Sequence, residues 1–182
     1  MKSRILICIS AAVLFAAVVL PGTLTAQQAR YTVTDLGTLG GTFSLAGGLN
    51  DKGDVEGFST LPGDQIIHAF LWRNGVMTDL GTLGGPNSAA AWRPSATGEV
   101  GGTAEGLTVD PNAENFCGFG TNLACVPFIW QNGTMTALPT LGGNNGAADG
   151  SNRRGQLVGV AENTTEDATC EAPHLLVSPL TV

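Results

Sequence analysis

A seven-residue phrase that recurs along the chain limits what this sequence can fold into. Asp-Leu-Gly-Thr-Leu-Gly-Gly occupies residues 35–41 and again 79–85, and a decayed copy, Leu-Pro-Thr-Leu-Gly-Gly, occupies 138–143. Leu36 thus recurs as Leu80 and, after a longer interval, as Leu138. Intervals of this size are typical of β-repeat units such as propeller blades. The sequence therefore predicts a repeat protein.

The first 26 residues have the layout of a secretory signal peptide and are left out of the fold. Lys2 and Arg4 form a basic start, residues 5–20 are apolar and uncharged, and Leu-Thr-Ala ends at Ala26. The alternative is an uncleaved anchor, but the apolar run at 5–20 is shorter than the roughly 20 residues that a membrane-spanning helix needs. We predict cleavage after Ala26, no membrane attachment afterwards, and a secreted or cell-surface protein, either extracellular or periplasmic.

Composition favours an all-β fold and argues against nucleic-acid partners. Without Lys2 and Arg4 the mature chain keeps six basic residues against 15 acidic ones, a net charge of −9. Such a surface repels phosphate backbones, so nucleic-acid binding is not expected. The 26 glycines and a charged fraction of only 13% point to short strands and frequent turns rather than helices.

Within one repeat the strand signals come in fours. The first unit predicts strands at 44–49, 54–59, 68–72 and 76–80, joined by turns that contain Asn-Asp-Lys-Gly and Asn-Gly. Four antiparallel strands in a meander are the blade unit of a propeller. We predict a signal peptide at 1–26 and one β-repeat domain at 27–182. Its units are about 35–79, 79–137 and an incomplete 138–182, which together make a partial β-propeller-like array.

Residues kept in step by the repeat have structural character. Phe70-Leu71-Trp72 recurs as Phe128-Ile129-Trp130, and both tryptophans are expected to pack between units. His68, by contrast, becomes Val126 in the next unit, which favours a structural or surface role over acid-base catalysis. In the third unit the same slot falls at 174–178, and the chain stops shortly afterwards at Val182. An open sheet edge is expected there, and with it self-association.

Several of these strings resemble the HAF-family extracellular repeat. They are Asp-Leu-Gly-Thr-Leu-Gly-Gly at 35–41, Leu-Asn-Asp-Lys-Gly at 49–53, His-Ala-Phe-Leu-Trp at 68–72 and Gly-Val-Met-Thr-Asp-Leu at 75–80. The resemblance covers about residues 31–159. It implies an exported bacterial repeat protein with a propeller-like fold, and it brings no established activity with it.

The second unit is longer than the first, and nearly all of the excess falls between Gly102 and Val126. Insertions in repeat proteins lie in loops on one rim, often the binding face. The candidate binding residues are therefore Asp110, Asn112 and Glu114 in this insert. Trp92 joins them because it is an aromatic residue that breaks the repeat. The alternative is an exposed loop that merely tolerates length.

Cys117 and Cys125 close the insert and are expected to form a disulfide in an oxidising compartment, which leaves Cys170 unpaired. Asp110-x-Asn112-x-Glu114 has the oxygen spacing that opens a calcium loop. It lacks the glycine at position six and the glutamate at position twelve, so no metal site is predicted.

No catalytic motif or cofactor-binding loop is found in the sequence. The leading hypothesis is a non-catalytic exported protein that serves as a surface scaffold or binding module for an unknown protein or glycan. One alternative is a carbohydrate-binding lectin that uses the insert and Trp92. The other is a secreted hydrolase with unidentified acids.

Overall fold

Residues 31–165 are described by the structure, a computed structural model, and they contain ten β-strands and no helix. All ten strands belong to the compact unit that begins at Asp35. The all-β prediction is confirmed. The signal peptide at 1–26, the strand slot at 174–178 and Cys170 lie outside the described residues.

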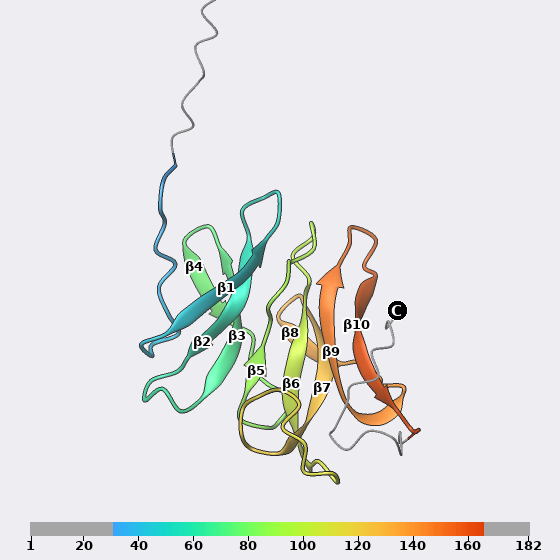
Figure 1. Ribbon diagram of the computed structural model, residues 1–182. Helices are drawn as coiled ribbons and strands as arrows, with labels where there is room; N and C mark the ends of the chain where they lie inside the picture. The colour runs from blue at the N-terminus through green and yellow to red at the C-terminus, as the bar shows by residue number, and fades with distance from the viewer. Residues whose placement is uncertain (1–30, 166–182) are drawn as a thin grey trace, which may run out of the picture. The chain divides into compact units, whose positions relative to one another are not determined.

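The strands form three antiparallel sheets in chain order (Figure 1). The first sheet has the order β1 (Ser44–Leu49), β2 (Val55–Thr60), β3 (Ile67–Arg73) and β4 (Val76–Asp79). The second has the order β5 (Ser88–Ala89), β6 (Val100–Val109), β7 (Leu123–Gln131) and β8 (Thr134–Ala137). The third pairs β9 (Gly142–Ser151) with β10 (Leu157–Asn163).

The four strands predicted for the first unit match β1 to β4 to within one residue at each end. The Asn-Gly turns explain part of this agreement. Asn74 and Gly75 have φ values of 51° and 85°, and Asn132 and Gly133 have 52° and 82°. Positive φ at both central residues is the mark of the type I′ turn, whose twist matches that of a hairpin. The same local chemistry therefore produces the same hairpin in both units.

A buried apolar cluster joins the first two sheets. Its members are small or aliphatic except for one aromatic ring, and they are Ala69, Leu71, Leu80, Ala90, Val100, Ala104 and Phe128. Trp130 is half-buried and packs against this cluster, as predicted, whereas Trp72 is half-buried but lies outside it. The repeat therefore places equivalent tryptophans in unequal surroundings.

A buried asparagine connects the second sheet to the first, and another connects the third sheet to the second. Asn87 Oδ1 accepts a hydrogen bond from the Ile67 N–H at 2.9 Å, and Asn145 Oδ1 accepts one from the Cys125 N–H, also at 2.9 Å. Donor and acceptor of the first bond are the repeat equivalents of donor and acceptor of the second, so the contact repeats with the sequence. The first unit has Phe43 at this position, where no sheet precedes it among the described residues.

The three sheets form no closed ring within residues 31–165, and the outer edge of β10 pairs with no strand of that part of the chain. The prediction of an incomplete third unit stays a prediction, because residues 166–182 lie outside the described part of the chain. The same residues include no helix that is long and apolar enough to cross a membrane.

Candidate functional site

The insert begins where β6 ends and is shaped by the carboxylate of Asp110. Asp110 is 2% exposed, and its Oδ1 accepts hydrogen bonds from the backbone N–H of Asn112 at 2.7 Å and of Glu114 at 3.4 Å. The Asp110 carbonyl accepts the N–H of Ala113 at 3.0 Å. A carboxylate that caps its own turn in this way fixes the loop locally. The alternate acidic and amide residues that looked like the start of a calcium loop thus form a turn.

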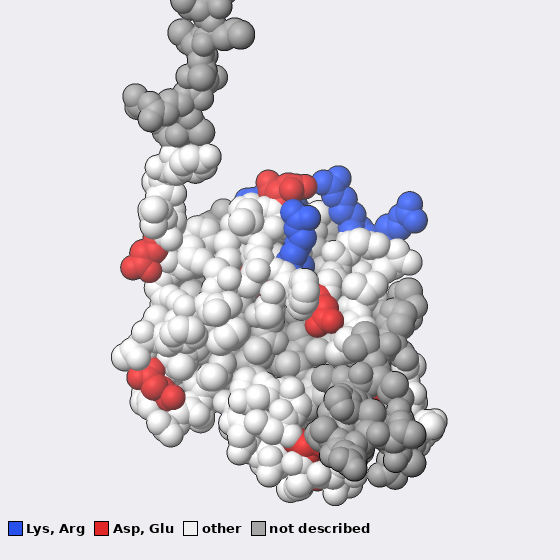
Figure 2. Space-filling view, viewed as in Figure 1, with Lys and Arg blue, Asp and Glu red and all other residues white. Residues whose placement is uncertain are grey.

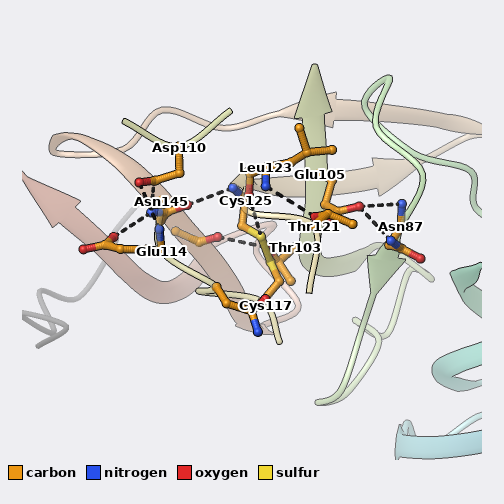
Figure 3. Close-up of a disulfide and its surroundings, with 12 residues drawn as sticks. Asn87, Thr103, Glu105, Asp110, Glu114, Cys117, Thr121, Leu123, Cys125 and Asn145 are labelled. Atoms are coloured by element: carbon orange, nitrogen blue, oxygen red, sulfur yellow. Dashed lines mark hydrogen bonds between the residues drawn. A yellow bond between two sulfur atoms is a disulfide. The ribbon is translucent and has the colours of Figure 1, made fainter. Parts of the chain in front are cut away.

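Three carboxylates converge on the side-chain amide of Asn145, which reaches the insert from β9. Figure 3 shows two of them, Asp110 and Glu114, beside Asn145. Asn145 Nδ2 lies 2.6 Å from Asp110 Oδ2, 3.1 Å from Glu114 Oε2 and 3.0 Å from Glu162 Oε1. An amide nitrogen carries only two hydrogens. At most two of the three carboxylates can accept a hydrogen from it at one time. Asp110 and Glu162 also accept backbone N–H groups, so Glu114 is the acid that depends most on this amide.

The surroundings of Glu114 favour its protonated form. Burial and hydrogen bonding to Glu162, together with the nearby charges of Glu162 and Asp110, raise the pKa of Glu114 to about 7. Carboxylate oxygens of the three acids lie within 4.8 Å of one another, a spacing that could hold a cation. However, the position that faces all three is already taken by an amide nitrogen, which is a donor and not a ligand. The arrangement is explained as a clasp that ties the insert to the third sheet.

The predicted disulfide is present. Cys117 and Cys125 are bonded, with their Cα atoms 6.1 Å apart, and the bond joins the insert to β7. Thr103 Oγ1 lies 3.2 Å from Cys117 Sγ and donates to the Gly146 carbonyl at 3.0 Å. The disulfide and the asparagine clasp therefore hold the insert against neighbouring strands at two separate points, as Figure 3 shows.

Trp92, the fourth candidate, lies away from the insert. The turn that follows it at Ser95 is bonded to the β1–β2 turn, because Asn50 Nδ2 donates to the Ser95 carbonyl at 2.8 Å. The long strand β6 then runs from this end of the sheet to the opposite end, where the insert begins (Figure 1). The structure thus brings Asp110, Asn112 and Glu114 together and leaves Trp92 at the other rim.

Trp92 is 57% exposed and is held by two acids. Its backbone N–H donates to Glu56 Oε1 at 2.8 Å, and its side chain donates to Asp149. Burial raises the pKa of Asp149, and the hydrogen bond from Trp92 opposes that rise. The Trp92 side chain is therefore linked to the third unit through Asp149.

His68 forms a cross-strand pair with Asp79, with Nδ1 to Oδ1 at 2.8 Å. Both partners change together in the next unit, where Val126 and Ala137 take the equivalent places. Because both residues are replaced together, the His68–Asp79 contact is explained as a local link between β3 and β4. This is in line with the structural role predicted for His68.

The sequence did not point to three residues that bond to the insert or to Trp92. Asn145 and Glu162 complete the clasp at the insert. The one sequence signal for Asn145 was that it aligns with Asn87 when Phe128 is aligned with Phe70. Glu56 is fully buried, and its Oε2 has no hydrogen-bond partner among the described residues.

The signal for Glu56 was equally slight. Glu56 lies opposite Leu71 across β2 and β3, and Gly101 lies opposite Ile129 at the equivalent place of the second sheet. In the third sheet the equivalent residue is Val158, which pairs with Gly150 as Glu56 pairs with Gly48. An acid therefore stands where the other units have an uncharged residue.

Comparisons of the chain with protein-family models, with curated proteins and with solved structures find no match. The resemblance to the HAF-family repeat is therefore still an expectation from sequence.

Proposed function

We propose that this chain is an exported, non-catalytic member of the HAF-family repeats that acts as a surface scaffold or binding module, with its sheets arranged as part of a propeller-like array. Export is supported by the amino-terminal layout and by the disulfide, which is typical of an oxidising compartment. The ligand would be a protein or a glycan.

One observation carries the proposal: the residues that the units share build and join the sheets. The buried rings Phe70 and Phe128 lie in the interior, and Asn87 and Asn145 bond one sheet to the preceding one. His68, the residue most suited to acid-base chemistry, is engaged with Asp79 and is not kept by the second unit. A repeat that keeps only architecture leaves its surfaces free to differ, which is how repeat proteins bind.

A carbohydrate-binding role is the second candidate, because Trp92 is the described tryptophan with the most exposed side chain and breaks the repeat. Aromatic faces of this kind pack against apolar surfaces of ligands. The insert and Trp92 would then serve separate sites, since they lie at opposite rims.

The test is to screen the full mature chain on glycan and protein arrays and, in parallel, on a broad panel of hydrolase substrates. We expect saturable binding to one ligand class and no turnover. Reproducible turnover that a point mutation in this chain abolishes would remove the binding proposal. Sedimentation should show self-association through the open edge of the third sheet, and a strictly monomeric protein would contradict that part.

A further inference from the structure

Position 92 is where the second unit departs from its neighbours. Counted from the Gly-Gly pair that ends the recurring phrase, Trp92 corresponds to Gly48 in the first unit and Gly150 in the third. A Cβ atom at Gly48 would lie 1.4 Å from the Trp92 carbonyl oxygen, so the two segments approach closely there. The absence of side chains at the two glycines leaves one large indole at the junction of three units. The repeat itself does not require it.

Two arginines and an aspartate meet at the rim that carries Trp92, and each comes from a different unit. Arg93 Nε donates to the Leu49 carbonyl at 3.1 Å, and Arg93 Nη2 lies 3.7 Å from Asp51 Oδ1. Arg153 Nη2 lies 3.1 Å from Asp51 Oδ2. The side chains of Arg93, Arg153 and Asp51 are 64%, 77% and 74% exposed. Two guanidinium groups with five N–H donors each thus share one carboxylate.

All lysines and arginines of residues 31–165 gather at this same rim. Figure 2 shows their blue atoms along one edge of the molecule, with red atoms between them and elsewhere on the surface. Four of them lie in or beside the turns that connect β1 to β2, β3 to β4 and β9 to β10, and they are Lys52, Arg73, Arg153 and Arg154. The fifth, Arg93, lies in the segment between β5 and β6.

Acidic groups at the rim cancel only part of this charge. Asp54 neutralises Arg73 through two bonds of 2.9 and 3.0 Å. Asp51, Glu99 and Asp149 stand against the remaining four cations. The rim is thus cationic in a chain whose formal net charge is −7.

We propose that the rim formed by Trp92, Arg93 and Arg153 binds an acidic saccharide whose pyranose rings carry carboxylate groups. This inference rests on the proposed binding function and names the site and ligand class. The apolar face of a sugar ring would pack on the indole of Trp92. Its carboxylate would accept paired hydrogen bonds from a guanidinium group, with Asp51 retaining the other. An exposed indole on the same rim as these cations favours a charged sugar over a bare polyanion, which gains nothing from the ring.

The test uses tetragalacturonate and its fully methyl-esterified form, which share a sugar backbone and differ in charge. Both are titrated into the full mature chain by calorimetry, and tryptophan fluorescence is followed in parallel. We expect the acid to bind and the ester to bind at least about tenfold more weakly, with the affinity for the acid falling at ~0.5 M salt.

Two variants copy residues that other units already carry at these positions, so the fold should tolerate them. Trp92→Gly reproduces Gly48 and Gly150, and Arg93→Ser reproduces Ser151. Each should weaken binding by about tenfold or more, as truncation of a Trp or Arg anchor does. Asn112→Ala, at the opposite rim, should leave the affinity unchanged.

Several outcomes of these titrations would contradict the proposal, and each identifies the part that is wrong. Equal affinity for acid and ester overturns the assignment of an acidic ligand. Polyphosphate binding that matches tetragalacturonate and survives Trp92→Gly reduces the rim to a bare cationic surface and also overturns the proposal. Failure of both sugars to bind overturns it as well. If an array ligand is instead lost in Asn112→Ala and kept in Trp92→Gly, this site is wrong while the binding function stands.

Discussion

Replacing Glu56 by glutamine should change how the stability of this protein depends on pH. The carboxyl group is fully buried on β2, and burial raises its pKa from the ordinary 4.5 to about 8, with the Trp92 N–H hydrogen bond opposing the rise. Below pH 4.5 the group is protonated in both the folded and the unfolded chain, so it adds no pH dependence. Between 4.5 and 8 the unfolded chain ionises while the folded chain stays protonated, so stability falls as pH rises.

The magnitude follows from the shift. Each pKa unit corresponds to about 1.4 kcal/mol. At pH 7 the unfolded group is roughly 2.5 units above its pKa, so Glu56 lowers the free energy of unfolding by about 3 kcal/mol relative to pH 4.5. Glutamine keeps an acceptor for the Trp92 N–H and cannot ionise, so this loss should disappear. The amide hydrogens of the new side chain are buried without partners and should lower stability at every pH by about 1–3 kcal/mol.

The diagnostic quantity is therefore the slope and not the absolute stability. Urea unfolding at several pH values from 4.5 to 8, followed by tryptophan fluorescence, gives the free energy of unfolding for the wild type and Glu56→Gln. The difference between the two should move in favour of the variant by about 3 kcal/mol from pH 4.5 to 7. Asp51→Asn, at an exposed carboxylate, is the control and should run parallel to the wild type. Parallel curves for Glu56→Gln would refute the reasoning about burial.

Three further predictions concern the contacts that hold the units and the insert. Replacing Cys117 and Cys125 by serine should lower the free energy of unfolding in urea by about 2–3 kcal/mol, because the unfolded chain loses a short closed loop; no change would contradict it. Gly48→Ala should cost about 1–3 kcal/mol or more in the same assay from overpacking, whereas Gly106→Ala, where the nearest atom to the new Cβ is 3.7 Å away, should cost less. Since the folded pKa of Glu114 is raised from 4.5 to about 7, its contribution is complete below pH 4.5 and is lost as pH rises toward 7, so Glu114→Gln should flatten the stability curve in that window.

The strands were predictable because their signals are local. The β3–β4 and β7–β8 hairpins are specified by Asn-Gly turns such as Asn74-Gly75, whose positive φ angles follow from the two residues alone. The insert could be located because the repeat supplies its own alignment, and the disulfide of Cys117 with Cys125 followed from proximity in sequence. None of these inferences required knowing which segments meet in space.

The rest could not be predicted because it depends on how the units sit beside one another. Asn145 is one amide in a turn-rich stretch until β9 places it against Asp110 and Glu114. Glu56 is one acid in a strand until the neighbouring unit covers it. The separation of Trp92 from the insert likewise depends on the direction of β6, which lies between them in the chain. The prediction that grouped Trp92 with the insert did not take this strand into account.

Two residues that break the repeat, Glu56 and Trp92, differ in burial. We expect the buried residue to affect stability and the exposed residue to affect binding. Glu56 stands in the interior where the other units have a glycine and a valine, and an ionisable group there lowers stability at neutral pH. A buried departure of this kind affects ligands only through the fold. Trp92 replaces a glycine at the surface, where it leaves the shared contacts intact and exposes an aromatic face. Mutations at Glu56 should therefore change unfolding and its pH dependence. Mutations at Trp92 should change affinity, with a stability cost limited to about 1 kcal/mol for the lost hydrogen bond to Asp149.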